Sequence, residues 1–195
     1  MRYQKSKAKN QKGKNQRKRK SRTDKSAAGA NIIMNVIKQR RSVREFKKEG
    51  VSKDIIRCIL EAGRWAPSGL NNQPWRFMVL EKEKKDALAQ FTHYSRIVQG
   101  CDKLILVFLD REKSYNYEKD LMALGACIQN MLLYIHQQKL GACWLGEILN
   151  QKGRIQQRLR VPKRKEFFGC IALGVPARTV QSGRRRPLKT LIDKP

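Results

Sequence analysis

The stretch that decides the fold runs from Ala123 to Gly146 and reads ALGACIQNMLLYIHQQKLGACWLG. Apolar side chains recur every three to four residues in its first half, as they do along one face of an α-helix. We predict a helix over 118–138, the longest in the chain, with an apolar stripe formed by Leu121, Leu124, Ile128, Leu132 and Ile135. Met122 and Met131 flank this stripe, so the helix is apolar on more than one side. In a chain this short, such a helix favours burial against a second copy.

Helices and strands alternate on both sides of this stretch. Gly141 ends the helical segment, and residues 142–145 start a strand. Further helices are predicted over 32–39, over 83–99 with a break near Thr92, and over 152–160, and another begins after the N-cap Ser52. Further strands are predicted over 75–80, 103–109 and 167–173. The basic segment 177–195 is expected to be extended. This order predicts an α+β fold in which a sheet is layered with helices.

The chain is strongly basic, with a formal net charge of +28. Residues 1–28 are rich in Lys, Arg, Gln, Asn and Ser and have almost no apolar side chain. Such a segment cannot bury enough surface to offset the entropy lost on ordering, so we predict a disordered basic tail over 1–28 and one folded domain over 29–195. Positive charge attracts nucleic acid, and contact of the tail with nucleic acid is one expectation. A nucleic-acid-binding protein stays open as an alternative function, although no helix-turn-helix, RNP or zinc signature occurs.

The five cysteines indicate reduced core thiols of a cytoplasmic protein. They are Cys58, Cys101, Cys127, Cys143 and Cys170. Their number is odd, no two form a CxxC pair, and several have apolar neighbours, which argues against a disulfide framework or a zinc site. No apolar run reaches the roughly 18 residues of a membrane helix, and the basic start lacks the apolar segment of a secretory signal. We therefore expect no membrane partner.

Three short stretches contain side chains suited to binding a polar ligand. Residues 40–44 (RRSVR) combine arginines with a hydroxyl and could grip a phosphate, or could be a solvated charge cluster. Residues 67–75 (PSGLNNQPW) could hydrogen-bond a heterocycle, or could be an ordinary surface turn. Residues 141–147 (GACWLGE) end a strand in glycine, which permits close approach of a flat ligand or merely closes a turn. No GxGxxG follows a strand and no P-loop occurs, so a nucleotide would be held without a Rossmann turn.

In this order, the three stretches resemble the nitroreductase family. The matching patterns are RRSxR, PSxxNxQPW, and an AxGxxxQNxxL helix that runs into GxxW[LI]G. The segments 174–176 (GVP) and 184–188 (RRRPL) resemble the usual end of the family's sequences. The resemblance covers residues 34–192 and leaves the basic tail without a counterpart.

The resemblance implies a nitroreductase-like fold: a central, mostly antiparallel sheet layered with helices, in an intertwined homodimer. It also implies FMN at the dimer interface, with both subunits lining each pocket. Arg40, Arg41 and Ser42 would bind the phosphate and ribityl end, Arg44 the pyrimidine edge, and Arg185 the phosphate. Leu145 and Gly146 would lie against the ring, with a backbone N–H near N5. Pro67, Ser68, Gly69, Asn71 and Gln73 would line the pocket, largely from the partner subunit.

The function implied is that of an FMN-dependent NAD(P)H oxidoreductase. Hydride would pass from NADH or NADPH through bound FMN to a small electrophilic acceptor, such as a nitroaromatic or a quinone. Because the flavin carries the chemistry, no catalytic side chain and no metal is expected. Of the two histidines, His136 lies on the long helix and favours a structural role, whereas His93 follows the predicted helix break and could face the pocket. A flavin-binding protein without turnover is a further alternative.

Overall fold

The computed structural model describes residues 31–179 and 183–193. The chain divides after Gln39, and the two parts are described separately. In the first part, residues 31–39 are helical, as predicted for 32–39. The predicted boundary between residues 28 and 29, and the tail before it, lie outside the described residues.

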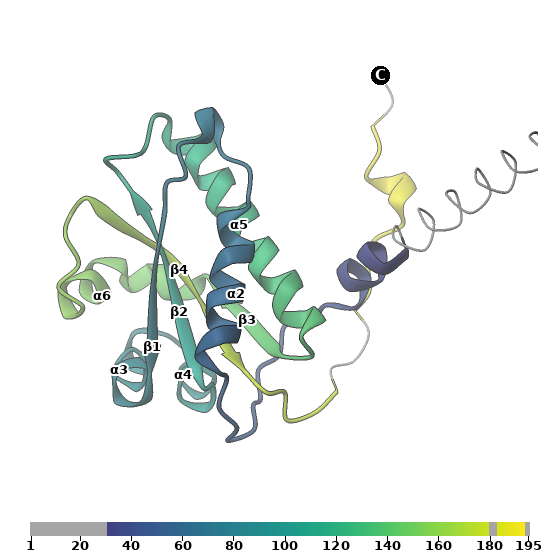
Figure 1. Cartoon of the computed structure of the whole chain (residues 1–195), viewed down its shortest axis with the longest axis horizontal. Coiled ribbons are helices and arrows are strands. Elements are labelled where there is room, and N and C mark those ends of the chain that lie inside the picture. Colours follow the sequence, from purple (N-terminus) through teal and green to yellow (C-terminus); the bar gives the residue numbers. More distant parts are fainter. Residues whose placement is uncertain (1–30, 180–182, 194–195) are drawn as a thin grey trace, which may run out of the picture. The chain divides into compact units, whose positions relative to one another are not determined.

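The second part is built on a four-stranded sheet (Figure 1). Its strands are β1 (Trp75–Glu81), β2 (Lys103–Asp110), β3 (Gly141–Leu145) and β4 (Lys165–Gly174), in the order β1-β2-β4-β3. Each neighbouring pair of these strands is antiparallel. The predicted antiparallel sheet is therefore confirmed, with strand bounds that extend the predicted ones by one to three residues.

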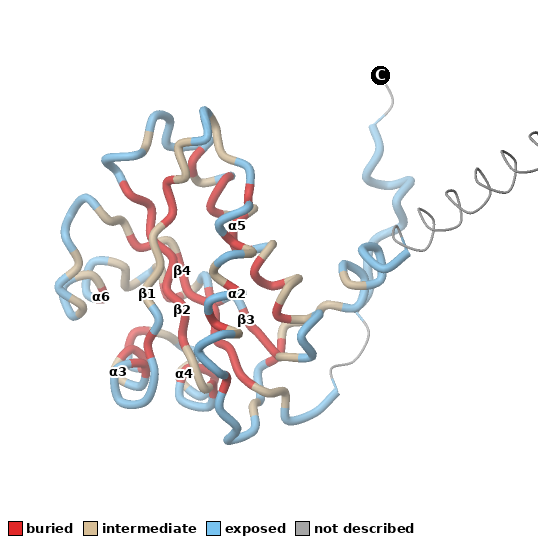
Figure 2. Tube along the Cα trace, viewed as in Figure 1, coloured by how far each residue is buried: buried red, intermediate tan, exposed pale blue. Residues whose placement is uncertain are grey.

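Helices cover both faces of the sheet (Figure 1). On one face lie α2 (Lys53–Arg64) and α5 (Tyr117–Gln137), packed on alternate residues of β2. On the other lie α3 (Lys82–Asp86), α4 (Ser95–Gly100) and α6 (Lys152–Arg158), packed on the remaining residues of β2. Residues 104–110 of β2 are consequently all buried (Figure 2), which explains why this strand is a continuous apolar run rather than an alternating one.

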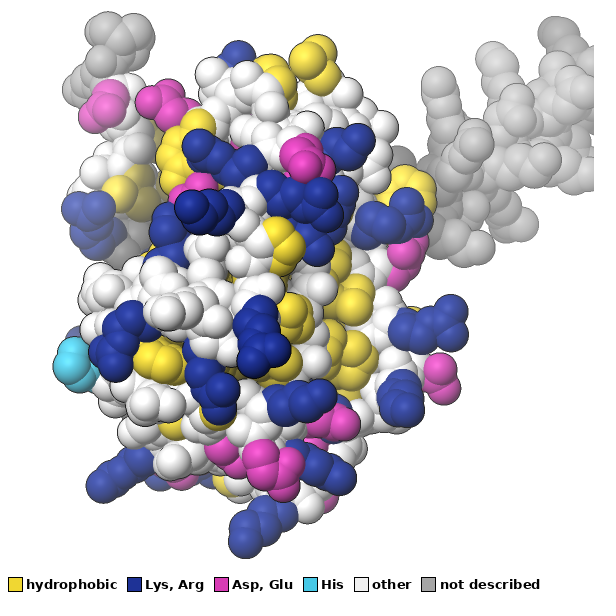
Figure 3. Space-filling view, turned by 90° about the vertical axis from the view of Figure 1, so that its left-hand side faces the viewer, with side chains coloured by type: hydrophobic (Ala, Val, Ile, Leu, Met, Phe, Trp, Pro, Cys, Tyr) yellow, Lys and Arg dark blue, Asp and Glu magenta, His cyan; other side chains and the backbone are white. Residues whose placement is uncertain are grey.

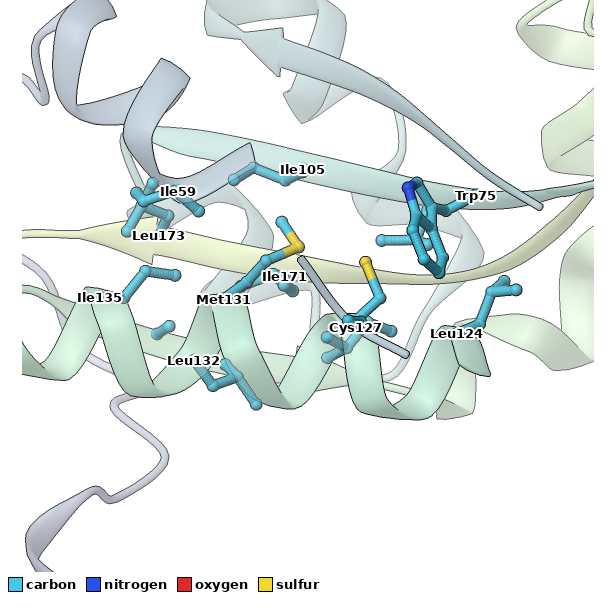
Figure 4. Packing of buried hydrophobic residues seen from close by; sticks show 14 of the residues in the cluster. Ile59, Trp75, Ile105, Leu124, Cys127, Met131, Leu132, Ile135, Ile171 and Leu173 are labelled. Atoms are coloured by element: carbon cyan, nitrogen blue, oxygen red, sulfur yellow. The ribbon is translucent and has the colours of Figure 1, made fainter. Parts of the chain in front are cut away.

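The long helix α5 matches its predicted bounds within one residue at each end. Its N-cap is Asn116, whose Oδ1 accepts a hydrogen bond from Lys119 N at 3.0 Å. Leu124, Ile128, Leu132 and Ile135 of the predicted stripe are buried in the core, and Leu121 packs against it. Figure 4 shows Leu124 and Ile135 on the side of α5 that faces the strands. Met131 also lies in this core and is fully buried, whereas Met122 is 73% exposed. Of the two methionines that widen the apolar surface, only Met122 is therefore available to a second chain.

The helix predicted over 83–99 is divided into α3, a 3₁₀ turn over Ala89–Phe91, and α4. The break near Thr92 is present, because Thr92 has an extended backbone. A second interruption before Ala89 was not predicted. Leu88 and Phe91, on either side of this interruption, are both buried in the core.

The remaining expectations concern the ends and the membrane. Ser52 caps α2 as predicted, since its Oγ accepts from Ile55 N at 3.3 Å. The C-terminal segment is not extended throughout, because Leu188–Thr190 forms a 3₁₀ turn. Among the described residues, no helix combines the length and the apolar character that crossing a membrane requires.

Candidate active site

The RRSVR segment lies against β3. Val43 N donates to Ala142 O at 2.9 Å, and Ser42 forms a parallel bridge with Ala142. A Cβ added at Gly141 would lie 2.7 Å from Val43 Cγ1, so glycine permits this close approach. The structure thus brings together two of the three stretches that the sequence singled out.

A cluster of three arginines gathers at this edge of the sheet. Arg40 and Arg41 are adjacent in the sequence, and Arg185 comes from a segment near the C-terminus. A Cβ added at Gly183 would lie 3.1 Å from Arg41 Nε and 3.1 Å from Arg185 Nη1. The pKa of Arg40 is lowered, first by burial and then by the charges of Arg41 and Arg185. Within the described residues, no carboxylate forms an ion pair with Arg40 or Arg185, so the cluster suits a polyanionic group.

Two residues beside this arginine cluster were not included among the predicted site residues. The pKa of His136 is lowered by burial and then by Arg40 and Arg41, which favours the neutral imidazole. Burial raises the pKa of the Cys143 thiol, while Arg44, Arg40 and a hydrogen bond with Ser42 oppose that rise. The helical and strand periodicities assigned both residues to the core, and no local signal links them to residues 40–44.

The loop over 67–73 is held in a compact, locally strained conformation. Ser68 Oγ accepts from Gln73 N at 3.1 Å, and Leu70, Asn71 and Gln73 have positive φ angles of 53°, 51° and 47°. A Cβ on Gly69 would overlap the ring end of Tyr115, so a larger residue there would require the Tyr115 side chain to move. Non-glycine residues with such φ angles persist where the surroundings hold them, and they are concentrated at functional sites.

The buried Asp120 is the anchor of this loop. Its Oδ1 accepts from Asn72 Nδ2 at 2.7 Å, and its Oδ2 accepts from Ser114 Oγ at 2.7 Å and Tyr115 N at 3.2 Å. The side chain is fully buried. At the start of a helix an acid is usually exposed and interacts with the helix dipole, so sequence reasoning did not identify this role.

Within one chain, the loop and the arginine cluster lie at opposite ends of α5. Asp120 holds the loop near the helix N-terminus, and His136 lies beside the arginines near its C-terminus. At about 1.5 Å per residue, these two positions are about 24 Å apart along the axis. A single chain therefore does not bring the predicted loop residues Pro67, Ser68, Gly69, Asn71 and Gln73 to the arginine cluster.

The end of β3 leaves space for a ligand above Gly146. Gly146 has a φ of −94°, and a Cβ built there would meet no atom within 4 Å. Leu145 was predicted to lie against the flavin ring, but its side chain is buried in the core together with residues of α4 and α6. Only the backbone of Leu145 is therefore available to a ring. The following Glu147 accepts from Thr92 Oγ1 at 2.6 Å and from His93 N at 3.2 Å, and the imidazole of His93 is exposed.

Comparisons with known proteins agree with this fold. The model of the nitroreductase family matches residues 37–95 and 92–175. A Desulfovibrio desulfuricans protein, described as a nitroreductase in complex with FMN, is 48% identical with a TM-score of 0.79, over 84% of this chain and 96% of that one. A Clostridium acetobutylicum protein described as an NADH oxidase is 30% identical with a TM-score of 0.75, over 81% and 97% of the two chains.

A sequence relative leads to the same assignment. YfhC of Bacillus subtilis, described as an NAD(P)H nitroreductase, is 26% identical over 179 residues, which are 82% of this chain and 92% of that protein. The resemblance to the family, which rests on the three sequence motifs, is thereby confirmed, together with the antiparallel sheet layered with helices that it implies. The family model matches well more than half of the residues of this chain, and the chain therefore belongs to the nitroreductase family.

Proposed function

We propose that this protein is an FMN-dependent oxidoreductase that passes hydride from NADH or NADPH through bound FMN to a small electrophilic acceptor, such as a nitroaromatic or a quinone. The observation that carries the proposal is the arginine cluster of Arg40, Arg41 and Arg185 near the start of β3, a strand whose other end is open at Gly146. Two relatives support it: the 48% identical protein was crystallised with FMN, and YfhC is described as an NAD(P)H nitroreductase.

The residues present fit FMN. Arg40, Arg41, Ser42 and Arg185 would hold the phosphate and ribityl end, because guanidinium groups bind phosphate in bidentate fashion. The backbone at Leu145 and Gly146 would face the ring, where the absence of a side chain leaves space. Arg44 would hold positive charge at the pyrimidine edge. The bound flavin supplies the hydride chemistry, and the protein binds it and fixes its orientation.

A second copy of the chain would complete the site. The loop residues Pro67, Ser68, Gly69, Asn71 and Gln73 are anchored about 24 Å along α5 from the arginine side, so we propose that they line the pocket of the partner subunit. Large apolar side chains are exposed where such a partner could cover them: Leu70, Met122, Leu188, Leu191 and Ile192. Because the loop and the arginine cluster lie at opposite ends of α5 within one chain, we propose a homodimer in which each subunit supplies the loop to the other subunit's site.

The proposal is tested by releasing and identifying the cofactor. The purified full chain should yield FMN, with a mass that distinguishes it from FAD. Anaerobic addition of NADH or NADPH should then bleach the flavin absorbance, and a panel of nitroaromatics and quinones should restore it. Bound FMN that neither nicotinamide bleaches would favour a flavin-binding protein without turnover. A folded protein that binds no flavin but retains nucleic acid would favour the nucleic-acid-binding alternative.

Gly146→Ala should weaken FMN binding without disturbing the fold. The added methyl group meets no described protein atom and the φ of Gly146 is negative, so the thermal unfolding midpoint of the flavin-free protein should not change. In the complex the methyl group would crowd the ring, at a cost of about 1–3 kcal/mol. The matched control is Gly153→Ala, which also adds its methyl group to open space but on α6. Equal FMN affinity in the two variants would place the ring away from Gly146.

Arg44→Ala should lower the two-electron potential of the bound flavin. Arg44 is exposed and donates from Nη1 to Ser42 O at 3.5 Å, so solvent screens its charge in part. A charge-assisted hydrogen bond contributes about 1.5–3 kcal/mol, and about 1.4 kcal/mol corresponds to 30 mV for two electrons. With screening, we expect a decrease on the order of 30 mV in a redox titration. Lys47→Ala, which removes an exposed cation paired with Glu49, is the control; a potential that Arg44→Ala leaves unchanged contradicts the assignment.

A further inference from the structure

A cavity of about 370 Å³ lies between α3 and α6, beside the end of the edge strand β1. Its apolar lining, which we call the floor, consists of Leu80, Ala87, Leu88 and Leu159; of these, Ala87 and Leu159 are partly exposed and the other two are buried. The volume is within the range of small-molecule pockets, which is about 300–1,000 Å³. Figure 3 views this side of the molecule, where hydrophobic side chains are visible between Lys and Arg side chains. The cavity is thus large enough to take part of a small organic molecule, whose apolar body would contact chiefly Ala87 and Leu159.

The rim of this cavity is positively charged. Lys84, Arg158 and Arg160 line it, against a single acid, Glu83. In the part of the chain that the structure describes, the side chains of these four residues form no ion pair and no hydrogen bond. Two neighbouring cations, in contrast, contact other parts of the fold. Lys85 donates to Val98 O and Gln99 O at the end of α4, and Arg154 lies over the ring of Phe91. The rim cations are therefore free to bind an anion.

Arg160 occupies a backbone position that favours glycine. It follows α6 with a φ of 51°, and the helix closes with Arg160 N donating to Gln157 O at 3.1 Å and Val161 N donating to Gln156 O at 2.9 Å. This paired closure is the Schellman motif, in which the left-handed residue is usually glycine. An arginine at this position is less favourable for the backbone than glycine, and it lines the cavity.

The cavity is separate from the candidate active site. It adjoins β1, whereas the RRSVR segment adjoins β3, and these are the two outer strands of the sheet. Three strand spacings of about 4.8 Å separate them, or about 14 Å. A ligand in the cavity would therefore not replace the flavin or its phosphate.

We infer that this cavity binds a small organic anion with an apolar body, of the class of medium-chain aliphatic carboxylates. The apolar floor would cover the chain, since burial of methylene groups drives such binding. The cationic rim would hold the carboxylate through charge-assisted hydrogen bonds from Arg158 and Arg160. The single acid on the rim leaves an excess of positive charge, which selects an anion over an uncharged molecule of the same length.

The test is a calorimetric titration of the flavin-loaded full chain with decanoate. Decanoate should bind, hexanoate should bind more weakly because it covers less of the floor, and decanol should bind at least tenfold more weakly than decanoate. Arg160→Gly should weaken decanoate binding at least tenfold while leaving the thermal unfolding midpoint unchanged or higher, because glycine suits the backbone there. That combination separates a lost ligand contact from a damaged fold.

The matched control is Lys139→Gly. Lys139 also has a positive φ, of 59°, and closes α5 by the same pattern, with Lys139 N donating to His136 O and Leu140 N donating to Ile135 O. This variant removes an equal charge from an equivalent backbone position outside the cavity, and it should bind decanoate like the unaltered protein. Three results would overturn the inference: no decanoate binding, equal losses in the two variants, or displacement of decanoate by a nitroaromatic acceptor, which would place it in the flavin site.

Discussion

Arg40→Ala is expected to weaken FMN binding by about 10- to 100-fold, because a hydrogen bond to a charged group contributes about 1.5–3 kcal/mol. Arg40 is half-buried, and its pKa is lowered by that burial and by the charges of Arg41 and Arg185. Without a bound anion these like charges repel one another. The flavin-free variant should consequently be as stable as the unaltered protein, or more stable. FMN titration followed by flavin fluorescence, with thermal unfolding of the flavin-free protein, measures both effects.

The control for this prediction is Arg164→Ala. Arg164 is an exposed arginine that pairs with Glu112 at 3.1 Å on another part of the surface. It should leave FMN affinity unchanged, because exposed ion pairs contribute little and Arg164 is not in the arginine cluster. If Arg40→Ala retains full FMN affinity, or if it destabilises the flavin-free protein as a core substitution would, the arginine cluster is a structural feature and not the phosphate site.

Asp120→Ala is expected to lower the free energy of unfolding by about 3 kcal/mol, because it removes three hydrogen bonds to a buried carboxylate. The donors are Ser114 Oγ, Tyr115 N and Asn72 Nδ2. For a chain of this length, each kcal/mol lowers the unfolding midpoint by about 2–4 °C. A decrease of about 6–12 °C in calorimetry is therefore expected. Because Asn72 belongs to the loop that we propose lines the partner's pocket, FMN affinity should also fall.

The same carboxylate should make stability depend on pH. Burial raises the pKa of Asp120, but the hydrogen bonds from Ser114, Asn72 and the backbone lower it more, so the net shift is downward. A group whose pKa is lower in the folded state stabilises the fold above its unfolded pKa, which is about 3.9 for aspartate. This contribution is lost as the pH falls below that value through the folded-state pKa. Asp120→Ala should therefore lessen the loss of stability between about pH 5 and pH 2.

A suitable comparison is Asp54→Ala. Asp54 also lies in the first turn of a helix, α2, but it is exposed. Its removal should cost only about 0.3–1 kcal/mol through the helix dipole. If the two variants lose equal stability, the hydrogen bonds to Asp120 do not hold the loop, and Asn72 is not positioned by this contact.

Elements that depend on local pattern could be predicted from the sequence. The helix α5 could be predicted because a helix that buries one side has apolar residues every three to four positions. The strand β2 could be predicted because a strand that is buried on both faces is a continuous apolar run. The N-cap Ser52 is likewise a local signal. The interrupted segment between β1 and β2 was predicted only in part, because the interruption before Ala89 has no glycine or proline to mark it in the sequence.

The sequence by itself determined the α+β class through the periodicity of its segments, and the family and the candidate residues at positions 40–44 through short motifs; the antiparallel sheet was implied only by the resemblance to that family. Only the tertiary structure decided which of these residues meet. Arg185 lies near Arg40 although 145 positions separate them in the chain. Asp120 holds Asn72 from 48 positions away, at the end of α5 opposite the arginines. Such contacts depend on how the sheet and its helices pack as a whole, and the spacing of residues along a chain does not contain that information.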